Sequence, residues 1–176
     1  AYYNYGIQFP LRGFSCSSQQ VPDLKDKFKK YDIFASLDVQ EVYGEENLEN
    51  ALRYSVNTFE SAVLINNQSF YDFKPLPNYA QFSSTNDIII DDFDNDDIMD
   101  ILLVGNMYHA EIETTRNDSG NGLLLKGIGD GNFKEISISE SGFFAPGDSK
   151  KIVSLKRNSD KLYIVANNND RLQIFK

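Results

Sequence analysis

Apolar residues recur at helical spacing in the first third of the chain. Between residues 21 and 52 they stand three or four positions apart, as in Leu24, Phe28 and Tyr31. This is the spacing of one face of an amphipathic α-helix. Gly44 interrupts the pattern, and glycine commonly ends a helix. The spacing therefore predicts a helical segment over 21–52 that is divided into two short helices at Gly44.

Residues 1–18 show a partial alternation of apolar and polar positions instead. Alternation with a period of two is typical of a β-strand, because successive side chains point to opposite faces. We therefore expect the opening segment to form an extended edge element. Together, residues 1–57 are predicted to be an extended N-terminal segment followed by a helical insertion.

From Thr58 onward the pattern changes to short runs of Val, Ile, Leu and Phe separated by Asn, Asp and Gly. Such runs, bounded by turn-forming residues, are typical of strands joined by tight turns. The chain is therefore predicted to be mainly β, with a small helical segment. The candidate strands are residues 62–66, 72–76, 88–91, 101–105, 122–126, 133–138, 152–155, 162–166 and 172–175.

The β-rich part resembles itself after about 60 residues. Residues 63–67 match 123–127, Phe73-Lys74 matches Phe133-Lys134, and residues 101–106 resemble 162–167. Four-stranded units repeating at 40 to 60 residues are typical of propeller blades, because one such sheet must stack on others to cover its faces. We therefore expect about two four-stranded propeller-type blades, over residues 58–118 and 119–176.

Two blades do not close a ring, since closed propellers have about four to eight. An open stack of two would leave apolar sheet faces exposed, and large exposed apolar patches usually mark an interface. We expect the chain to be the C-terminal portion of a larger β-propeller, or one chain of an assembly that supplies the remaining blades. The alternative is that the helical N-terminal part covers one face.

An acidic segment between two candidate strands carries the strongest chemical signal. Asp92, Asp94, Asp96 and Asp100 occupy positions 1, 3, 5 and 9 of a loop, and Ile98 occupies position 7. Carboxylates at alternate positions of such a loop converge, and the carbonyl at position 7 joins them as ligands of a hard cation. The spacing predicts a Ca²⁺ site at these five residues; Mg²⁺ is disfavoured because it requires a stricter octahedron and retains water.

Two features qualify this prediction. Position 6 usually holds a glycine because the backbone turns sharply there, and this chain has Asp97. The segment is also compatible with a solvated acidic hairpin turn, because Asp and Asn favour turns without any metal. The corresponding loop of the second unit, residues 154–161, is shorter and offers only Asp160 as an acid, so one metal site is expected.

Composition narrows the classes of function. Acids outnumber bases 26 to 17, giving a net charge of −9, which argues against a nucleic-acid partner and is compatible with cation binding. The single cysteine, Cys16, excludes a disulfide framework and a cysteine-rich zinc site, and is expected to be a buried or incidental thiol. No apolar run approaches the ~20 residues of a membrane-spanning helix, so the chain is not expected to span a membrane.

Other candidate sites are weaker. His109, Glu111 and Glu113 stand at alternate positions, which would place their side chains on one face of a strand. Such a group could form a second metal site or an acid–base site. We favour the alternative interpretation, a solvated edge strand. Arg116 and Asp118 are close enough for a loop ion pair. Residues 127–131 lack the strand-to-helix context of a phosphate-binding loop and are expected to be a hairpin turn. No pair of carboxylates placed to flank a glycosidic bond can be named.

The acidic segment resembles a known family. Residues 90–106 are similar to the Asp-Phe-Asp-Gly-Asp-Gly-x-x-Asp-Leu core of FG-GAP/VCBS repeats, and residues 127–133 resemble the Gly-Asp-Gly-x-Phe hairpin that accompanies it. The likeness extends over about residues 18–176. The arrangement is similar to the C-terminal end of secreted VCBS-repeat proteins of Bacteroidota related to ASPIC/UnbV-type proteins.

This resemblance implies an extracellular or bacterial outer-membrane-surface β-propeller with loop-bound Ca²⁺ and no established catalytic machinery. The ligand roles fall on Asp92, Asp94, Asp96, the Ile98 carbonyl and Asp100. The expected function is a non-catalytic, calcium-stabilised binding or assembly module, whose partners are the remaining blades or a cell-surface protein or glycan. The alternatives are a carbohydrate-active propeller enzyme and an accessory subunit of an outer-membrane nutrient-uptake complex.

Overall fold

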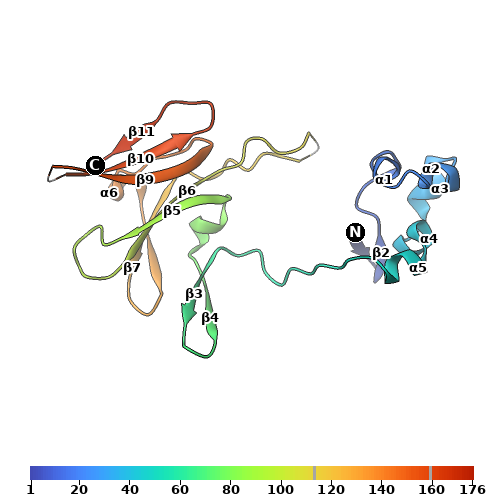
Figure 1. Cartoon of the computed structure of the whole chain (residues 1–176), viewed down its shortest axis with the longest axis horizontal. Helices are drawn as coiled ribbons and strands as arrows, with labels where there is room; N and C mark the ends of the chain where they lie inside the picture. Colours follow the sequence, from blue (N-terminus) through green and yellow to red (C-terminus); the bar gives the residue numbers. More distant parts are fainter. Residues whose placement is uncertain (113, 159) are drawn as a thin grey trace. The chain divides into compact units, whose positions relative to one another are not determined.

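The computed structural model describes residues 1–112, 114–158 and 160–176. The chain divides into two compact units, Ala1–Asn57 and Thr58–Lys176 (Figure 1). The boundary falls where the spacing of apolar residues changes from helical runs to short strand-like runs. Each unit has buried apolar side chains of its own.

The first unit is a small hairpin followed by five short helices. Phe28, Phe34 and Val42 form its core together with Leu24. Gly44 (φ 84) lies between the fourth and fifth helices, as the sequence predicted. The elements are β1 (Tyr2–Asn4), β2 (Ile7–Phe9), α1 (Phe14–Gln20), α2 (Leu24–Lys27), α3 (Tyr31–Ser36), α4 (Val39–Tyr43) and α5 (Glu45–Glu49).

Two expectations for this unit need correction. The opening segment is extended only in β1 and β2, and from Phe14 it is helical. Phe14 packs against Tyr31 and Phe34, with ring centroids 5.1 and 5.3 Å apart, so a tertiary contact outweighs the local alternation. The helical segment predicted over 21–52 forms four helices rather than two. One of the added starts, that of α4, is capped by the Asp38 carboxylate, which accepts from Glu41 N at 2.8 Å.

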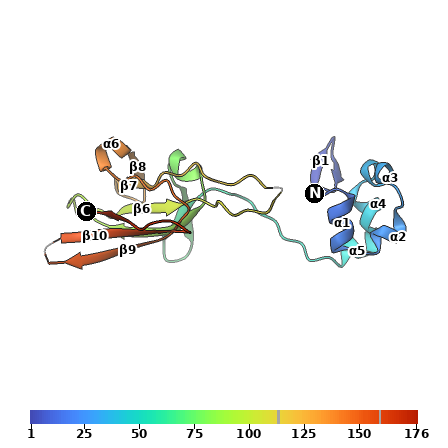
Figure 2. The same cartoon turned by 90° about the horizontal axis from the view of Figure 1, so that it is seen from above.

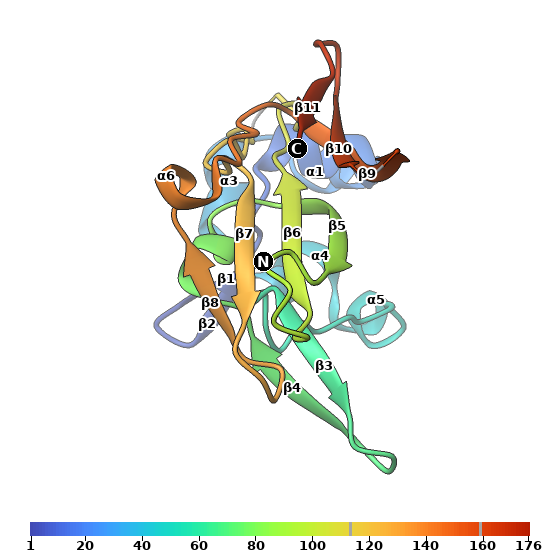
Figure 3. The same ribbon diagram turned by 90° about the vertical axis from the view of Figure 1, so that its left-hand side faces the viewer.

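The described part of the second unit forms three antiparallel sheets, and each candidate strand predicted from the sequence overlaps a strand of the structure. The central sheet has the order β5-β6-β7-β8, which Figure 3 shows side by side. The strands are β3 (Ala62–Asn66) and β4 (Tyr71–Pro75); β5 (Thr85–Asp91), β6 (Asp100–Gly105), β7 (Leu123–Gly127) and β8 (Phe133–Ile136); and β9 (Ser149–Arg157), β10 (Asp160–Asn167) and β11 (Gln173–Phe175). A 3₁₀-helix, η1 (Asn78–Gln81), precedes β5, and α6 (Ile138–Ser141) follows β8.

The prediction of a mainly β chain is confirmed, but the strands group differently from the expected units. A boundary at residue 118 would separate β6 from β7, whereas Leu103 pairs with Leu123 and the two strands lie in one sheet. The sheets therefore contain two, four and three strands instead of two sets of four. A sequence repeat indicates how far apart the strands lie along the chain. Which strands share a sheet depends instead on the hydrogen bonds between strands that lie next to each other in space.

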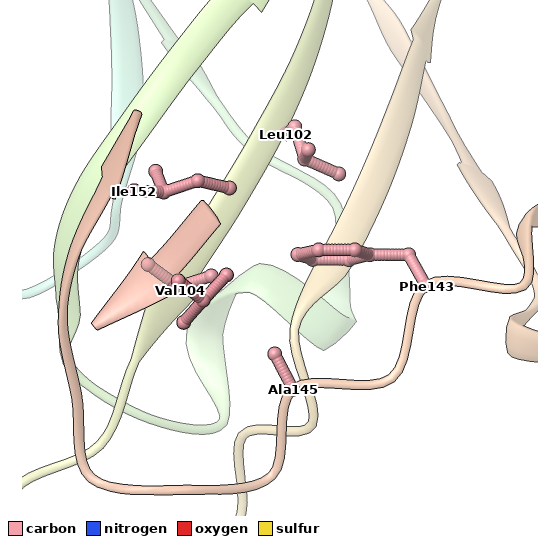
Figure 4. Packing of buried hydrophobic residues seen from close by; sticks show 6 residues of the cluster. Leu102, Val104, Phe143, Ala145 and Ile152 are labelled. Atoms are coloured by element: carbon pink, nitrogen blue, oxygen red, sulfur yellow. The ribbon is translucent and has the colours of Figure 1, made fainter. Parts of the chain in front are cut away.

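Strand β6 of the central sheet is covered on both faces. Ile101 and Leu103 of β6 point to one face and pack with Leu125, Ala80 and the β3 residue Val63. Leu102 and Val104 point to the other face, where the cluster also contains Phe143, Ala145, Ile152 and Val165 (Figure 4). The β9–β10 layer runs alongside β6 (Figure 2). Every residue of β6 is buried, as expected for a strand between two layers.

Candidate metal centre

The acidic segment forms the loop that joins β5 to β6. The last paired residues of the two strands are Asp91 and Asp100, so residues 92–99 close the hairpin. Asn95 (φ 62) and Asp97 (φ 64) both adopt the left-handed backbone conformation. Asn and Asp reach this conformation more readily than other non-glycine residues, because their short polar side chains bond locally. Asp97 thus takes the backbone conformation for which glycine is usual at position 6.

The Asp92 carboxylate organises the loop from inside. It accepts the backbone N–H groups of Asn95 at 2.7 Å, Asp96 at 3.2 Å and Asp97 at 3.0 Å. These bonds satisfy amides that the tight turn removes from the sheet ladder. The acidic-turn interpretation therefore describes the backbone of this loop correctly, and the same turn sets the direction of the neighbouring carboxylates.

Asp100 anchors the loop to the sheet. Its side chain is 2% exposed, and its two oxygens accept Phe93 N at 3.0 Å and Gly127 N at 2.8 Å. The second bond reaches β7, so one carboxylate joins the β5–β6 loop to the β7–β8 hairpin. A β-carbon at Gly127 would lie 2.4 Å from the Met99 carbonyl oxygen, so this approach needs glycine.

Three of the five predicted ligands converge. Asp92, Asp94 and Asp100 each offer a carboxylate oxygen, and these oxygens all lie within 4.8 Å of one another. Oxygens sharing one Ca²⁺ at 2.3–2.6 Å lie no more than about 5 Å apart, so this group fits a divalent cation. Carboxylates at about 5 Å repel each other by roughly 1 kcal/mol in water, and by more near buried Asp100, so a bound cation would stabilise the loop.

Asp96 and Ile98 stand outside this group. The Asp96 carboxylate accepts Ile98 N at 2.9 Å and contacts the Lys126 ammonium at 2.9 Å. Ile98 is thereby fixed through its amide, while the ligand role of its carbonyl stays a prediction. For a cation held by the other three aspartates, Asp96 would have to turn away from Lys126 to become a ligand.

Lys126 is the participant that the sequence pattern did not reveal. It lies on β7 and its ammonium contacts Asp94 as well as Asp96. Hydrogen bonds to these two carboxylates raise the pKa of Lys126 above its ordinary value. The bond from Lys126 is the main reason that the pKa of Asp96 is lowered. Since Lys126 follows the loop by more than twenty residues, only the pairing of β6 with β7 brings it there.

The remaining candidates do not form a second cluster. His109 is exposed, and its neighbours 108–112 form no strand, because the chain leaves the sheet after the bridge between Met107 and Asn117. The edge strand that we favoured for this segment is therefore wrong over the part described, and Glu113 lies outside the described residues. Within 1–112, 114–158 and 160–176, the three aspartates are the one group of His, Cys, Asp and Glu placed to hold a metal.

Two smaller predictions are confirmed. Arg116 Nε lies 2.6 Å from Asp118 Oδ2, which is the expected loop ion pair. Residues 127–131 form the turn of the β7–β8 hairpin, in which Ile128 N donates to Asn132 O at 3.0 Å. Cys16 lies in α1 and is partly buried.

No family model, curated protein or solved structure matches the chain. Among the residues that the structure describes, no helix is long and apolar enough to cross a membrane.

Proposed function

We propose that Thr58–Lys176 is part of an FG-GAP/VCBS-type β-propeller, and that it serves as a non-catalytic, calcium-stabilised binding or assembly module outside the cell. The observation that carries this proposal is the convergence of Asp92 and Asp94 of the β5–β6 loop with Asp100 at the start of β6. Asp100 is buried and bonded to β7, so a cation held here would stiffen the junction of two hairpins.

The layering of the sheets supports the assembly part of the proposal. Both outer layers of the stack present apolar side chains to solvent. Leu64 and Phe73 face each other across β3 and β4 and are 59% and 41% exposed. On the opposite layer, Val153 and Ile174 flank Ile164 across three strands and are 45% and 63% exposed. Further blades or another chain would cover such faces.

A calcium titration tests the metal site directly. Calorimetry should detect Ca²⁺ binding to the wild-type chain, with Mg²⁺ binding more weakly because it requires a stricter geometry. Asp94→Asn should abolish the binding or weaken it by at least about tenfold, because Asp94 is one of the three converging ligands. Asp72→Asn removes an exposed carboxylate of β4 and should leave the affinity unchanged.

A substitution of Lys126 provides a second test, in which the Ca²⁺ affinity is expected to rise instead of fall. Its ammonium competes with the cation for Asp94, so Lys126→Met should tighten Ca²⁺ binding by about threefold to fivefold, the range of a partly exposed ion pair. Lys156→Met removes an equal charge from an exposed position of β9 and serves as the control. Absence of Ca²⁺ binding to the wild-type chain, or equal effects of both lysine variants, would contradict the proposal.

A further inference from the structure

A cavity of about 440 Å³ lies within the second unit, away from the acidic loop. Residues 79–80 and 82–85, from η1 into β5, form one wall. Residues 119–122 before β7 and 135–139 from β8 into α6 form the other. Leu103, Gly105 and Leu123 lie between the two walls. The acidic loop follows the end of β5, whereas the cavity lies at its beginning. The volume falls within the range of small-molecule sites, about 300–1,000 Å³.

Hydrogen bonds hold the two walls together. The side chain of Asn106, which is 1% exposed, accepts from Ser83 Oγ at 2.6 Å and from Gly120 N at 2.8 Å. The Glu135 carboxylate accepts Tyr79 N at 2.9 Å, which joins β8 to η1. The cavity is therefore formed before any ligand enters, and a pre-formed site avoids the cost of ordering its walls on binding.

The polar part of the lining carries one acidic side chain and is otherwise rich in hydroxyl groups. Glu135 is its one carboxylate, and the described lining contains no Lys, Arg or His. The Ser84 hydroxyl is buried without a hydrogen-bond partner among the described residues, and such a group gains most from a polar ligand or water. The hydroxyl and amide side chains are Ser83, Ser84, Thr85, Ser119, Asn121, Ser137 and Ser139.

Two aromatic rings stand on one wall of the cavity. Tyr79 and Phe82 have ring centroids 5.1 Å apart and are 62% and 49% exposed. The negative faces of aromatic rings attract weakly positive C–H groups, such as those on the apolar face of a sugar ring. An exposed aromatic pair beside neutral hydroxyl groups thus matches a ligand that has one apolar face and many hydroxyl groups.

We propose that this cavity binds a neutral saccharide, with Tyr79 and Phe82 stacking on the sugar and Glu135 and the serine hydroxyls bonding to its hydroxyl groups. An anionic ligand would find no cationic side chain in the described lining, and a wholly apolar one would desolvate the polar groups without compensation. The proposal narrows the binding role proposed above, but it uses no residue of the acidic loop.

Saturation-transfer NMR with the full chain tests this site, using maltose, cellobiose and N,N′-diacetylchitobiose at up to about 50 mM, concentrations at which binding in the millimolar range is detected. At least one disaccharide should receive saturation. Tyr79→Ala and Phe82→Ala should each weaken its binding by about tenfold, in line with the loss of one aromatic contact. Tyr71→Ala and Phe70→Ala remove exposed aromatics at the β3–β4 hairpin and should change binding by less than about twofold.

The titrations are made with Ca²⁺ and with chelator, so that failure of the metal site and failure of the cavity can be told apart. Folding of each variant is checked by its amide NMR spectrum. If none of the three disaccharides binds the folded wild-type chain, the proposal is overturned. Equal weakening by all four variants, or none by Tyr79→Ala and Phe82→Ala, also overturns it, because the sugar would then lie elsewhere.

Discussion

Individual aspartates have different structural roles in and beside the β5–β6 loop. Asp92 bonds to three backbone amides of the loop, whereas the buried Asp100 bonds across to β7. Asp97 supplies a left-handed backbone conformation. The same residue type is therefore a turn former, an anchor and a stand-in for glycine, according to its position. Counting acidic residues in the sequence does not distinguish these roles; their spacing does so only in part.

Two substitutions of Asp97 allow the effect of backbone strain on stability to be measured separately from the effect of charge. Asp97→Gly and Asp97→Ala both remove the carboxylate, but alanine at φ 64 is strained and glycine is not. The glycine variant should be more stable than the alanine variant by about 1 kcal/mol in urea denaturation. Equal stabilities would show that the loop relaxes away from the left-handed conformation when the aspartate is lost.

Asp148 is expected to make stability depend on pH. Its side chain is 2% exposed; burial raises its pKa, but bonds from Lys150 at 2.5 Å and Asn168 at 3.1 Å lower the pKa more, so it lies below its ordinary value. A carboxyl group with a lowered pKa contributes stability above its unfolded pKa of about 4, and loses it as the pH falls through the folded pKa.

Asp148→Asn should therefore be less stable than the wild type at pH 7, and the difference should shrink as the pH falls below about 4. Denaturant unfolding between about pH 7 and pH 2.5 measures this difference. Asp72→Asn, at an exposed position of β4, provides the control and should follow the wild-type curve. A difference that stays constant down to pH 2.5 would mean that the Asp148 charge contributes nothing.

Strand β6 organises the elements around it. Its six residues are buried, its two faces meet different layers, and its two ends lead into the acidic loop and the segment at Asn106. At its end, the register between β5 and β6 shifts between Thr85 and Asp87. Irregularities of this kind bring backbones close together and commonly need small residues.

Gly105 lies at this close approach between β5 and β6. A β-carbon there would stand 1.7 Å from the Ser84 carbonyl oxygen, so Gly105→Ala should destabilise the second unit by at least about 3 kcal/mol in urea denaturation. A β-carbon at Gly129 would have no atom within 4 Å, so only the positive φ (86) disfavours alanine there. Gly129→Ala should therefore lower the free energy of unfolding by about 1 kcal/mol. Similar losses in both variants would contradict the close packing of β5 against β6.

The chain consists of two units with separate cores. The candidate cation ligands all lie in the second unit, so a ligand that binds only there stabilises only that unit. A metal should therefore affect one part of the unfolding transition and leave the other unchanged.

Calcium removal tests this expectation. At a Ca²⁺ concentration about 100 times the Kd, binding adds about 2.7 kcal/mol, so excess chelator should lower the melting temperature of the second unit by several degrees. Scanning calorimetry should show that the transition of Ala1–Asn57 does not move. Asp94→Asn is the control, because its melting should be insensitive to chelator. A wild-type melting curve that is unchanged by excess chelator would refute calcium stabilisation.

The sequence by itself determined the local features of this protein. The nine strands in the described part of Thr58–Lys176, the stop at Gly44 and the acidic turn follow from the period of apolar residues and from turn-forming residues, which act over a few neighbours. The tertiary structure alone decided the grouping of β5 to β8 into one sheet, the helix beginning at Phe14, and the contact of Lys126 with Asp94 and Asp96. These depend on pairing and packing between residues far apart in the chain, which no local pattern encodes.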